Sequence, residues 1–139
     1  MALGMHVKET KGRVLVIDDE SEVRRIIRLA LEKQGYDVVE APDGEKAIEV
    51  IRAGDNPLLT DVIICDVRMP KINGVEAVAF FREQFPSVPI IVLTGYPDMQ
   101  LATSFIKQGV IEYLVKPVEK EKLVEVVDKA MSNRSLTGG

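Results

Sequence analysis

Short runs of apolar, mostly β-branched residues alternate with longer amphipathic segments along almost the whole chain. The runs occupy residues 14–17, 38–39, 62–65, 89–93 and 112–115. Such runs, rich in Val and Ile, are typical of strands that are buried on both faces of a sheet. The segments between them are long enough for the crossover helices that parallel strands require. The alternation therefore predicts an α/β fold, a doubly wound three-layer sandwich with helices on both faces of a parallel five-stranded sheet.

The amphipathic segments carry apolar residues three or four positions apart, the spacing of a helix that packs on one face. The first of them, residues 21–34, stops before Gly35, a residue type that commonly ends helices. The expected buried stripes are Val23, Ile26, Ile27, Ala30 and Leu31; Ala47, Ile48 and Ile51; Val75, Val78 and Phe81; Ala102, Phe105 and Ile106; and Leu123, Val126, Val127, Ala130 and Met131. We expect residues 54–60 (GDNPLLT) to form a loop.

The length and composition of the chain limit its organisation and its partners. With 139 residues we predict one domain over 12–131, an N-terminal arm over 1–11, and a C-terminal tail or clipped linker over 132–139. A net charge of −4 argues against direct contact with nucleic acid, whose phosphates demand a basic surface. No apolar run approaches the roughly 20 residues of a membrane helix. The single cysteine, Cys65, lies in an apolar run as a core residue, and we expect a cytoplasmic protein.

Polar residues follow four of the five expected strands at the point where each strand ends. They are Asp18 and Asp19, then Asp66, Thr94 and Lys116. Each residue alone has a structural explanation, since the acids and the threonine could cap turns or helices and the lysine could be solvated. In an open parallel sheet, however, the carboxyl ends of the strands form one edge, where ligands bind. The sequence therefore predicts a polar site at this edge.

The residue types at this edge fit phosphoryl transfer. Clustered carboxylates repel one another and call for a cation or for shifted pKa values. Oxygen ligands of this kind suit Mg²⁺, and a carboxylate such as Asp66 can attack phosphorus to give an aspartyl phosphate. The Lys116 ammonium and the Thr94 hydroxyl can each take a phosphoryl oxygen, while Gly95 would allow the backbone to approach closely.

Four motifs in this order cover nearly the whole chain and carry a resemblance to a known family. They are VLVIDDE (14–20), DVRMP (66–70) with Gly74, IIVLTG (90–95) and YLVKP (113–117). The sequence resembles a receiver domain of a bacterial two-component response regulator, of the chemotaxis-type single-domain kind. This resemblance implies a flavodoxin-like (βα)₅ fold with strand order 2-1-3-4-5.

The resemblance also implies the roles of the residues at the site. Asp66 would be the phosphoacceptor. Asp18 and Asp19 would be acidic ligands of Mg²⁺, together with Asp66 and the backbone carbonyl of Arg68. No other cofactor is implied.

Three further residues match positions that the family uses to bind and sense the phosphoryl group. Thr94 matches its switch hydroxyl, Lys116 its phosphate-binding lysine and Tyr113 its switch aromatic. The bond between Lys116 and Pro117 is expected to be cis. The family's usual output surface would be formed by the helix around 102–106, the strand 112–115 and the helix 123–131.

The partners implied are a histidine kinase or phosphotransfer protein and, for the output, an attached domain or a downstream protein. The domain would be a monomer or a phosphorylation-dependent homodimer, catalysing only its own phosphorylation and dephosphorylation. One alternative is a Mg²⁺-dependent phosphohydrolase with an aspartyl nucleophile, although such enzymes commonly carry a second Asp where this chain has Arg68. Another is a nucleotide- or flavin-binding module, but Asp18, Asp19 and Glu20 stand where a glycine-rich phosphate loop would be needed.

Overall fold

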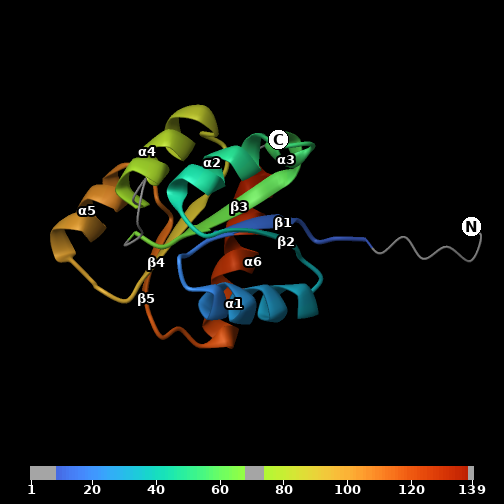
Figure 1. Cartoon of the computed structure of the whole chain (residues 1–139), viewed down its shortest axis with the longest axis horizontal. Coiled ribbons are helices and arrows are strands. Elements are labelled where there is room, and N and C mark those ends of the chain that lie inside the picture. The colour runs from blue at the N-terminus through green and yellow to red at the C-terminus, as the bar shows by residue number, and fades with distance from the viewer. Residues whose placement is uncertain (1–8, 68–73, 138–139) are drawn as a thin grey trace, which may run out of the picture.

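The computed structural model describes residues 9–67 and 74–137, which form five strands and six helices (Figure 1). The strands are β1 (Arg13–Ile17), β2 (Asp37–Ala41), β3 (Thr60–Cys65), β4 (Ile90–Thr94) and β5 (Glu112–Val115). The helices are α1 (Ser21–Lys33), α2 (Gly44–Arg52), α3 (Asn56–Leu59), α4 (Gly74–Gln84), α5 (Met99–Lys107) and α6 (Lys120–Thr137). None of these helices is long and apolar enough to cross a membrane.

All neighbouring strands pair in parallel, in the order β2-β1-β3-β4-β5. The predicted α/β fold and its strand order are therefore confirmed. The middle strands are buried on both faces, which explains why their sequences read as continuous apolar runs instead of alternating with polar residues.

Two apolar cores lie on opposite faces of the sheet, because successive side chains of a strand point to opposite sides. Leu15 and Ile63 face the layer that holds α2, α4 and α5. Val14 and Ile64 face the layer that holds α1 and α6. Figure 1 shows these two helical layers on either side of the strands. The sole cysteine, Cys65, lies in the first core, and burial raises the pKa of its thiol.

The prediction of a loop over residues 54–60 is wrong, because α3 forms within it and β3 begins at Thr60. Pro57 lies in the first turn of α3, where its missing N–H leaves no hydrogen bond unmade. The backbone carbonyl of Asp55 accepts hydrogen bonds from the N–H groups of Leu58 and Leu59 and closes the turn. A helix this short has no apolar stripe by which the sequence could reveal it.

The last helix also differs from expectation, since α6 continues past Met131 to Thr137. The apolar stripe predicts a helix only as far as Met131, with a tail over residues 132–139. Three residues predicted to be buried are instead exposed: Ile26 (45%), Val75 (38%) and Ile106 (52%). Each lies at the edge of its stripe, where one step of about 100° along the helix separates a buried position from an exposed one.

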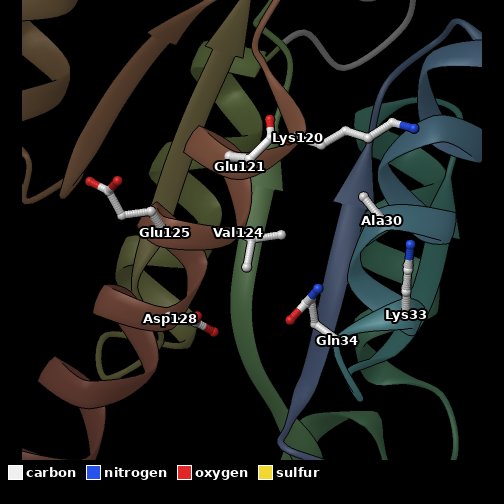
Figure 2. Close-up of a pocket in the computed structure, with 8 residues that line it drawn as sticks. All are labelled: Ala30, Lys33, Gln34, Lys120, Glu121, Val124, Glu125 and Asp128. Atoms are coloured by element: carbon white, nitrogen blue, oxygen red, sulfur yellow. The ribbon is translucent and has the colours of Figure 1, made fainter.

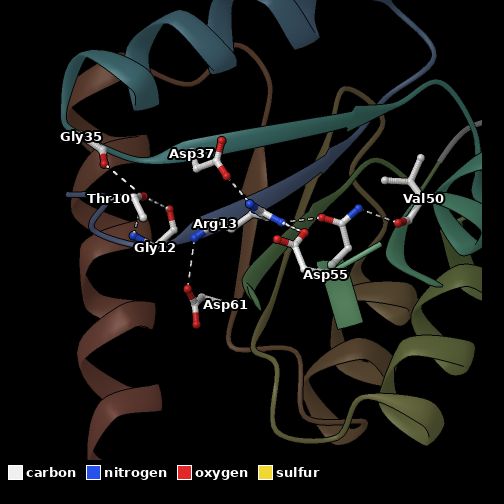
Figure 3. A network of polar contacts seen from close by, with 9 residues as sticks. Thr10, Gly12, Arg13, Gly35, Asp37, Val50, Asp55 and Asp61 are labelled. Carbon is white, nitrogen blue, oxygen red and sulfur yellow. Dashed lines mark hydrogen bonds and ion pairs between the residues drawn. The ribbon is translucent and has the colours of Figure 1, made fainter. Parts of the chain in front are cut away.

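A polar network around Arg13 fixes α3 to the first two strands (Figure 3). The Arg13 guanidinium donates to Asp37 at 2.6 Å, to Asp55 at 2.7 Å and to Asn56 at 2.8 Å. The backbone N–H of the same residue donates to the Asp61 carboxylate at 3.0 Å. The hydrogen bond from Arg13 lowers the pKa of the Asp55 carboxyl. These contacts lie at the amino ends of the strands, away from the edge at which the sequence predicts a site.

Thr60, at the start of β3, is 2% exposed, and its hydroxyl has no hydrogen-bond partner within the described residues. A buried hydroxyl without a partner has lost its hydrogen bonds to water and has no hydrogen bond in the protein to replace them, which costs free energy. We therefore expect Thr60→Val, which keeps the shape of the side chain, to raise the free energy of unfolding by about 1 kcal/mol in urea denaturation.

Thr94→Val is the matched control, because the buried Thr94 hydroxyl does have a partner, the Tyr96 N–H, at 3.1 Å. This variant should be less stable than the parent. A loss of stability in both variants would mean that the Thr60 hydroxyl is also hydrogen-bonded.

Candidate functional site

The topology of the sheet brings Asp18 and Asp66 together. Ile17 and Cys65 are paired residues at the ends of the neighbouring strands β1 and β3, and each is followed by one of the two aspartates. The Asp66 N–H donates to the Ile17 carbonyl at 2.9 Å, which extends the ladder one residue past the strand. The chain continues from β1 into α1 on one face of the sheet and from β3 into α4 on the other. The two acids therefore lie at the point where the winding reverses, the usual place of a ligand site.

Lys116, which directly follows β5, contacts both of these acids. Its ammonium lies 2.6 Å from an Asp18 carboxylate oxygen, 3.2 Å from Asp66 and 3.4 Å from Glu20. The Lys116 N–H donates to the Thr94 carbonyl at 2.8 Å, so that β4 sets the position of the lysine backbone. With its side chain only 16% exposed, Lys116 is a partner of the acids and not a solvated strand end.

Burial and charge together set the protonation of this cluster. Asp18 is 2% exposed, and burial raises the pKa of its carboxyl; the hydrogen bonds from Lys116 and from the Glu20 N–H oppose this effect. The nearby charge of Asp66 raises the Asp18 pKa further. Burial alone would lower the pKa of the Lys116 ammonium, but the hydrogen bond and charge of Asp18 outweigh it and raise that pKa. The lysine is therefore positively charged at neutral pH. It neutralises part of the negative charge of Asp18, Asp19, Glu20 and Asp66, which together are called the acid cluster.

The loop from β1 to α1 places three carboxylates together. One oxygen from each of Asp18, Asp19 and Glu20 lies within 4.8 Å of the others. Asp18 is buried whereas the other two are exposed. Asp19 does not cap α1, and no hydrogen bond or ion pair engages its side chain among the described residues.

This donor set fits Mg²⁺. All the available ligand atoms are oxygens, and a buried carboxylate such as Asp18 gains from a nearby cation. Glu20 is a member of this cluster that the sequence alone does not identify. Its side chain reaches Lys116 only in the folded protein. The proposed ligand carbonyl of Arg68 lies outside the described residues.

Thr94 and Tyr113, the two predicted switch residues, lie on the neighbouring strands β4 and β5. The Thr94 hydroxyl is fully buried at the end of β4 and accepts the Tyr96 N–H; the cap of α5 is the Asp98 side chain, not Thr94. The Tyr113 hydroxyl, from β5, accepts the Asp98 N–H at 3.2 Å. The Tyr113 ring stacks on Phe105 of α5 with 6.4 Å between ring centroids. Both ends of the Tyr113 side chain therefore contact α5 or its cap.

The backbone at Gly74 lies directly against the backbone of Asp66 and Val67. A Cβ atom at Gly74 would lie 2.2 Å from the Val67 Cα and 2.5 Å from the Asp66 carbonyl oxygen, which no side chain can tolerate. At Gly95 a Cβ atom would meet only Lys116, at an ordinary 3.8 Å. Only glycine therefore fits at position 74, whereas the approach of the Gly95 backbone to a phosphoryl group stays a prediction. The Lys116–Pro117 peptide bond is cis, as the resemblance predicted.

Within the described part of the chain, grooves lie between α1 and α6, and one of them reaches the site. The groove in Figure 2 runs between α1 and α6, lined by residues such as Ala30 and Val124, and it includes no member of the acid cluster. The second groove is apolar and is lined by residues of α1 and the start of α6, including Val23 and Ile26. It extends to Lys116 at the edge of the acid cluster.

Comparisons with known proteins agree on one family. The family model described as the response regulator receiver domain matches residues 14–128. The regulatory protein AtoC of Escherichia coli is 31% identical over 90% of the chain, and the probable transcriptional regulator ycf27 of Porphyridium aerugineum is 35% identical over 91%. The chain spans only 26% of the length of AtoC and 53% of that of ycf27.

Solved structures give the same picture. A response regulator receiver domain protein from Clostridium thermocellum superposes with a TM-score of 0.83 at 32% identity, covering 90% of this chain and 98% of that one. The Vibrio cholerae chemotaxis protein CheY4 superposes with a TM-score of 0.76 at 30% identity, covering 86% and 98%. These likenesses favour a receiver over the phosphohydrolase alternative.

Proposed function

The chain belongs to the response regulator receiver domain family, whose members are phosphoacceptor switches, and on this premise we propose that Asp66 is the residue that accepts the phosphoryl group. The observation that carries the proposal is the contact of Lys116 with both Asp66 and Asp18 at the reversal point of the sheet. Asp66 is 4% exposed, its backbone is held by the β-ladder, and its carboxylate is held by burial and by Lys116. A fixed nucleophile beside a fixed cation is the arrangement that phosphoryl transfer needs.

The transfer takes place between a phosphohistidine and the Asp66 carboxylate. A carboxylate oxygen of Asp66 attacks phosphorus, the bond from phosphorus to the histidine nitrogen breaks, and that nitrogen keeps the electron pair. The product is the mixed anhydride of Asp66 and phosphate. Lys116 is already 3.2 Å from Asp66 and can pair with the new negative charge.

Receiver domains bind Mg²⁺ at an acidic pocket, and Asp18, Asp19 and Glu20 form such a pocket here. We assign Asp18, Asp19 and Asp66 as the residues that would hold the ion, with the Arg68 carbonyl as a further ligand. When bound, Mg²⁺ would supply positive charge to neutralise phosphoryl oxygens. Asp18 is held by its backbone and by Lys116, whereas the Asp19 side chain has no hydrogen bond or ion pair among the described residues and would be available to the metal.

Phosphorylation is read out through Thr94 and Tyr113. A phosphoryl group adds about −1.5 to −2 charges and three acceptor oxygens at a fixed point. By turning toward one of these oxygens, the Thr94 hydroxyl would give up its bond to the Tyr96 N–H. Tyr113, which holds the cap of α5 through Asp98, is the side chain through which such a change would reach the surface of α5, β5 and α6.

We expect Thr94→Ala to uncouple this readout while leaving the site able to bind a phosphoryl mimic, because the variant lacks the hydroxyl that senses the phosphoryl oxygens. In amide NMR spectra, fluoroberyllate should shift the signals of α5 and Tyr113 strongly in the parent and only weakly in Thr94→Ala.

Thr103→Ala is the control, since Thr103 is exposed and its hydroxyl bonds within α5 to the Met99 carbonyl. It should respond like the parent. Undiminished shifts around α5 in Thr94→Ala would mean that the coupling runs by another route.

The partner that donates the phosphoryl group is a histidine kinase or a phosphotransfer protein. The apolar groove beside α1 suits it, because the groove extends from Val23 and Ile26 to Lys116 at the site itself. A protein seated there would have its phosphohistidine next to Asp66. The output is an attached domain or a downstream protein, and the domain acts as a monomer or as a phosphorylation-dependent homodimer. We place this exchange in the cytoplasm, which suits the single buried thiol of Cys65.

The proposed chemistry is limited to the protein's own phosphorylation and dephosphorylation, and this can be tested directly. Incubation with acetyl phosphate and Mg²⁺ should add the mass of one phosphoryl group to the intact protein, and EDTA should prevent it. The protein should not turn over p-nitrophenyl phosphate, a phosphomonoester that a phosphohydrolase would cleave. Turnover of this ester would favour the phosphohydrolase. A protein that gains no mass with acetyl phosphate would contradict the proposed phosphoacceptor.

A further inference from the structure

Residues 18–20, between β1 and α1, form the acidic loop. Its backbone is held by two hydrogen bonds at Asp18. Its N–H donates to the Ala41 carbonyl of β2 at 3.1 Å. Its carbonyl accepts a hydrogen bond from the Arg24 guanidinium of α1 at 2.6 Å. This carbonyl belongs to the planar peptide that joins Asp18 to Asp19, so its orientation fixes the position of the Asp19 Cα atom from which the side chain leaves. Among the described residues, no hydrogen bond or ion pair of its own side chain holds Asp19.

Arg24 is itself fixed by Glu40 of β2. The guanidinium Nε of Arg24 lies 3.1 Å from one oxygen of the Glu40 carboxylate, and Arg28 donates to the other oxygen at 2.5 Å. With both oxygens engaged, the carboxylate cannot rotate without breaking an ion pair. The side chains of Arg24 and Glu40 are only 16% and 25% exposed, so water competes weakly for these bonds. A chain of contacts thus runs from Glu40 through Arg24 to the peptide that carries Asp19.

We infer that Arg24, braced by Glu40, is a positioning residue for the metal site: it orients the Asp18–Asp19 peptide and so directs the Asp19 carboxylate toward the ion. The inference rests on the proposed role of Asp18 and Asp19 as Mg²⁺ ligands. Arg24 is not assigned as a metal ligand or as a phosphoryl contact, and it acts through the backbone. Partners of this outer kind hold metal ligands in place, and their loss typically weakens metal binding by tenfold or more.

The sign of the effect separates positioning from simple electrostatics. A guanidinium near the acid cluster repels a divalent cation, so removing its charge alone would tighten Mg²⁺ binding. Removing the hydrogen bond that orients the Asp18–Asp19 peptide would weaken Mg²⁺ binding. Arg28 provides the matched control, because it pairs with the same Glu40 carboxylate, and within the described part of the chain its only other ion pair is with Glu32.

The experiment is a Mg²⁺ titration of the unphosphorylated protein, followed by calorimetry and by the amide signals of Asp19 and Glu20. We expect Arg24→Ala to weaken Mg²⁺ binding by about tenfold. Arg28→Ala should bind as the parent does or slightly tighter, and Arg24→Lys, which keeps the charge and one donor, should recover part of the loss. Urea unfolding of the same variants shows whether each folds, and folded Arg24→Ala with weaker binding supports the inference.

The outcomes that overturn the inference are distinct from the failure of the proposed function. If the parent binds Mg²⁺ and Arg24→Ala binds it equally well or tighter, Arg24 does not position the site, whereas the receiver function stands. If Arg28→Ala weakens binding as much as Arg24→Ala, the effect belongs to the ion pairs with Glu40 and not to the loop. A folded parent that binds no Mg²⁺ contradicts the metal site and the inference together.

Discussion

Replacing Asp66 with Asn is expected to slow phosphoryl acceptance from acetyl phosphate by more than about a thousandfold, the scale of loss that follows removal of a nucleophile. An amide oxygen of the same shape is a far poorer nucleophile than a carboxylate, although it can still accept the hydrogen bond from Lys116. Asp18, the neighbouring acid, is engaged by Lys116 at 2.6 Å and by the Glu20 N–H at 2.9 Å, and cannot take over. The measurement is the intact mass of the protein over time.

Asp43→Asn is the matched control for this variant. Asp43 is also a buried aspartate, 8% exposed, but it caps α2 by accepting the Lys46 N–H at 2.8 Å and lies outside the acid cluster. Its phosphorylation rate should equal that of the parent. An Asp66→Asn protein that gained phosphate as fast as Asp43→Asn would exclude Asp66 as the acceptor.

Asp19→Ala should weaken Mg²⁺ binding by roughly an order of magnitude, since affinity for such ions follows the number of charged ligands. Phosphorylation by acetyl phosphate should slow with it. The same variant should be slightly more stable than the parent in the absence of metal, because it relieves repulsion with Asp18 and Glu20. Calorimetric titration with Mg²⁺ and urea unfolding without metal measure the two effects.

Weaker Mg²⁺ binding together with higher stability is the result expected when an acid serves a ligand and not the fold. Glu22→Ala controls for the general negative field near the site, because Glu22 is an exposed acid in the first turn of α1 that pairs with Arg25. Its Mg²⁺ affinity should change little. Equal affinities in Asp19→Ala and Glu22→Ala would show that Asp19 is not a ligand.

Much of the site could be predicted because it depends on strand ends. In a parallel sheet the carboxyl ends of the strands gather at one edge whatever the helices do. Asp18, Asp66 and Lys116 directly follow their strands and Thr94 is the last residue of β4. Their types then limit the chemistry. The contacts of Lys116 with both acids agree with this expectation.

What the sequence could not reveal depends on how far side chains reach in three dimensions. An arginine in an amphipathic helix is usually solvated, so nothing in the pattern distinguishes Arg24, which bonds the acidic loop, from Arg28, which does not. For the same reason, the sequence does not show that Glu20 belongs to the acid cluster. The short helix α3 has no periodic pattern, and the polar end of α6 beyond Met131 carries no stripe to mark it as helical. Local rules therefore found the strand ends but not the supporting contacts.

The central claim, that the phosphoryl group is carried by Asp66 as an acyl phosphate, can be tested by one chemical measurement. Borohydride reduces an acyl phosphate to the alcohol and converts a phosphorylated aspartate into homoserine. After treatment with acetyl phosphate, Mg²⁺ and then borohydride, peptide mass spectrometry should find homoserine at position 66 and at no other aspartate. Homoserine at position 18 or 19, or phosphate that remains attached after reduction, would contradict the assignment.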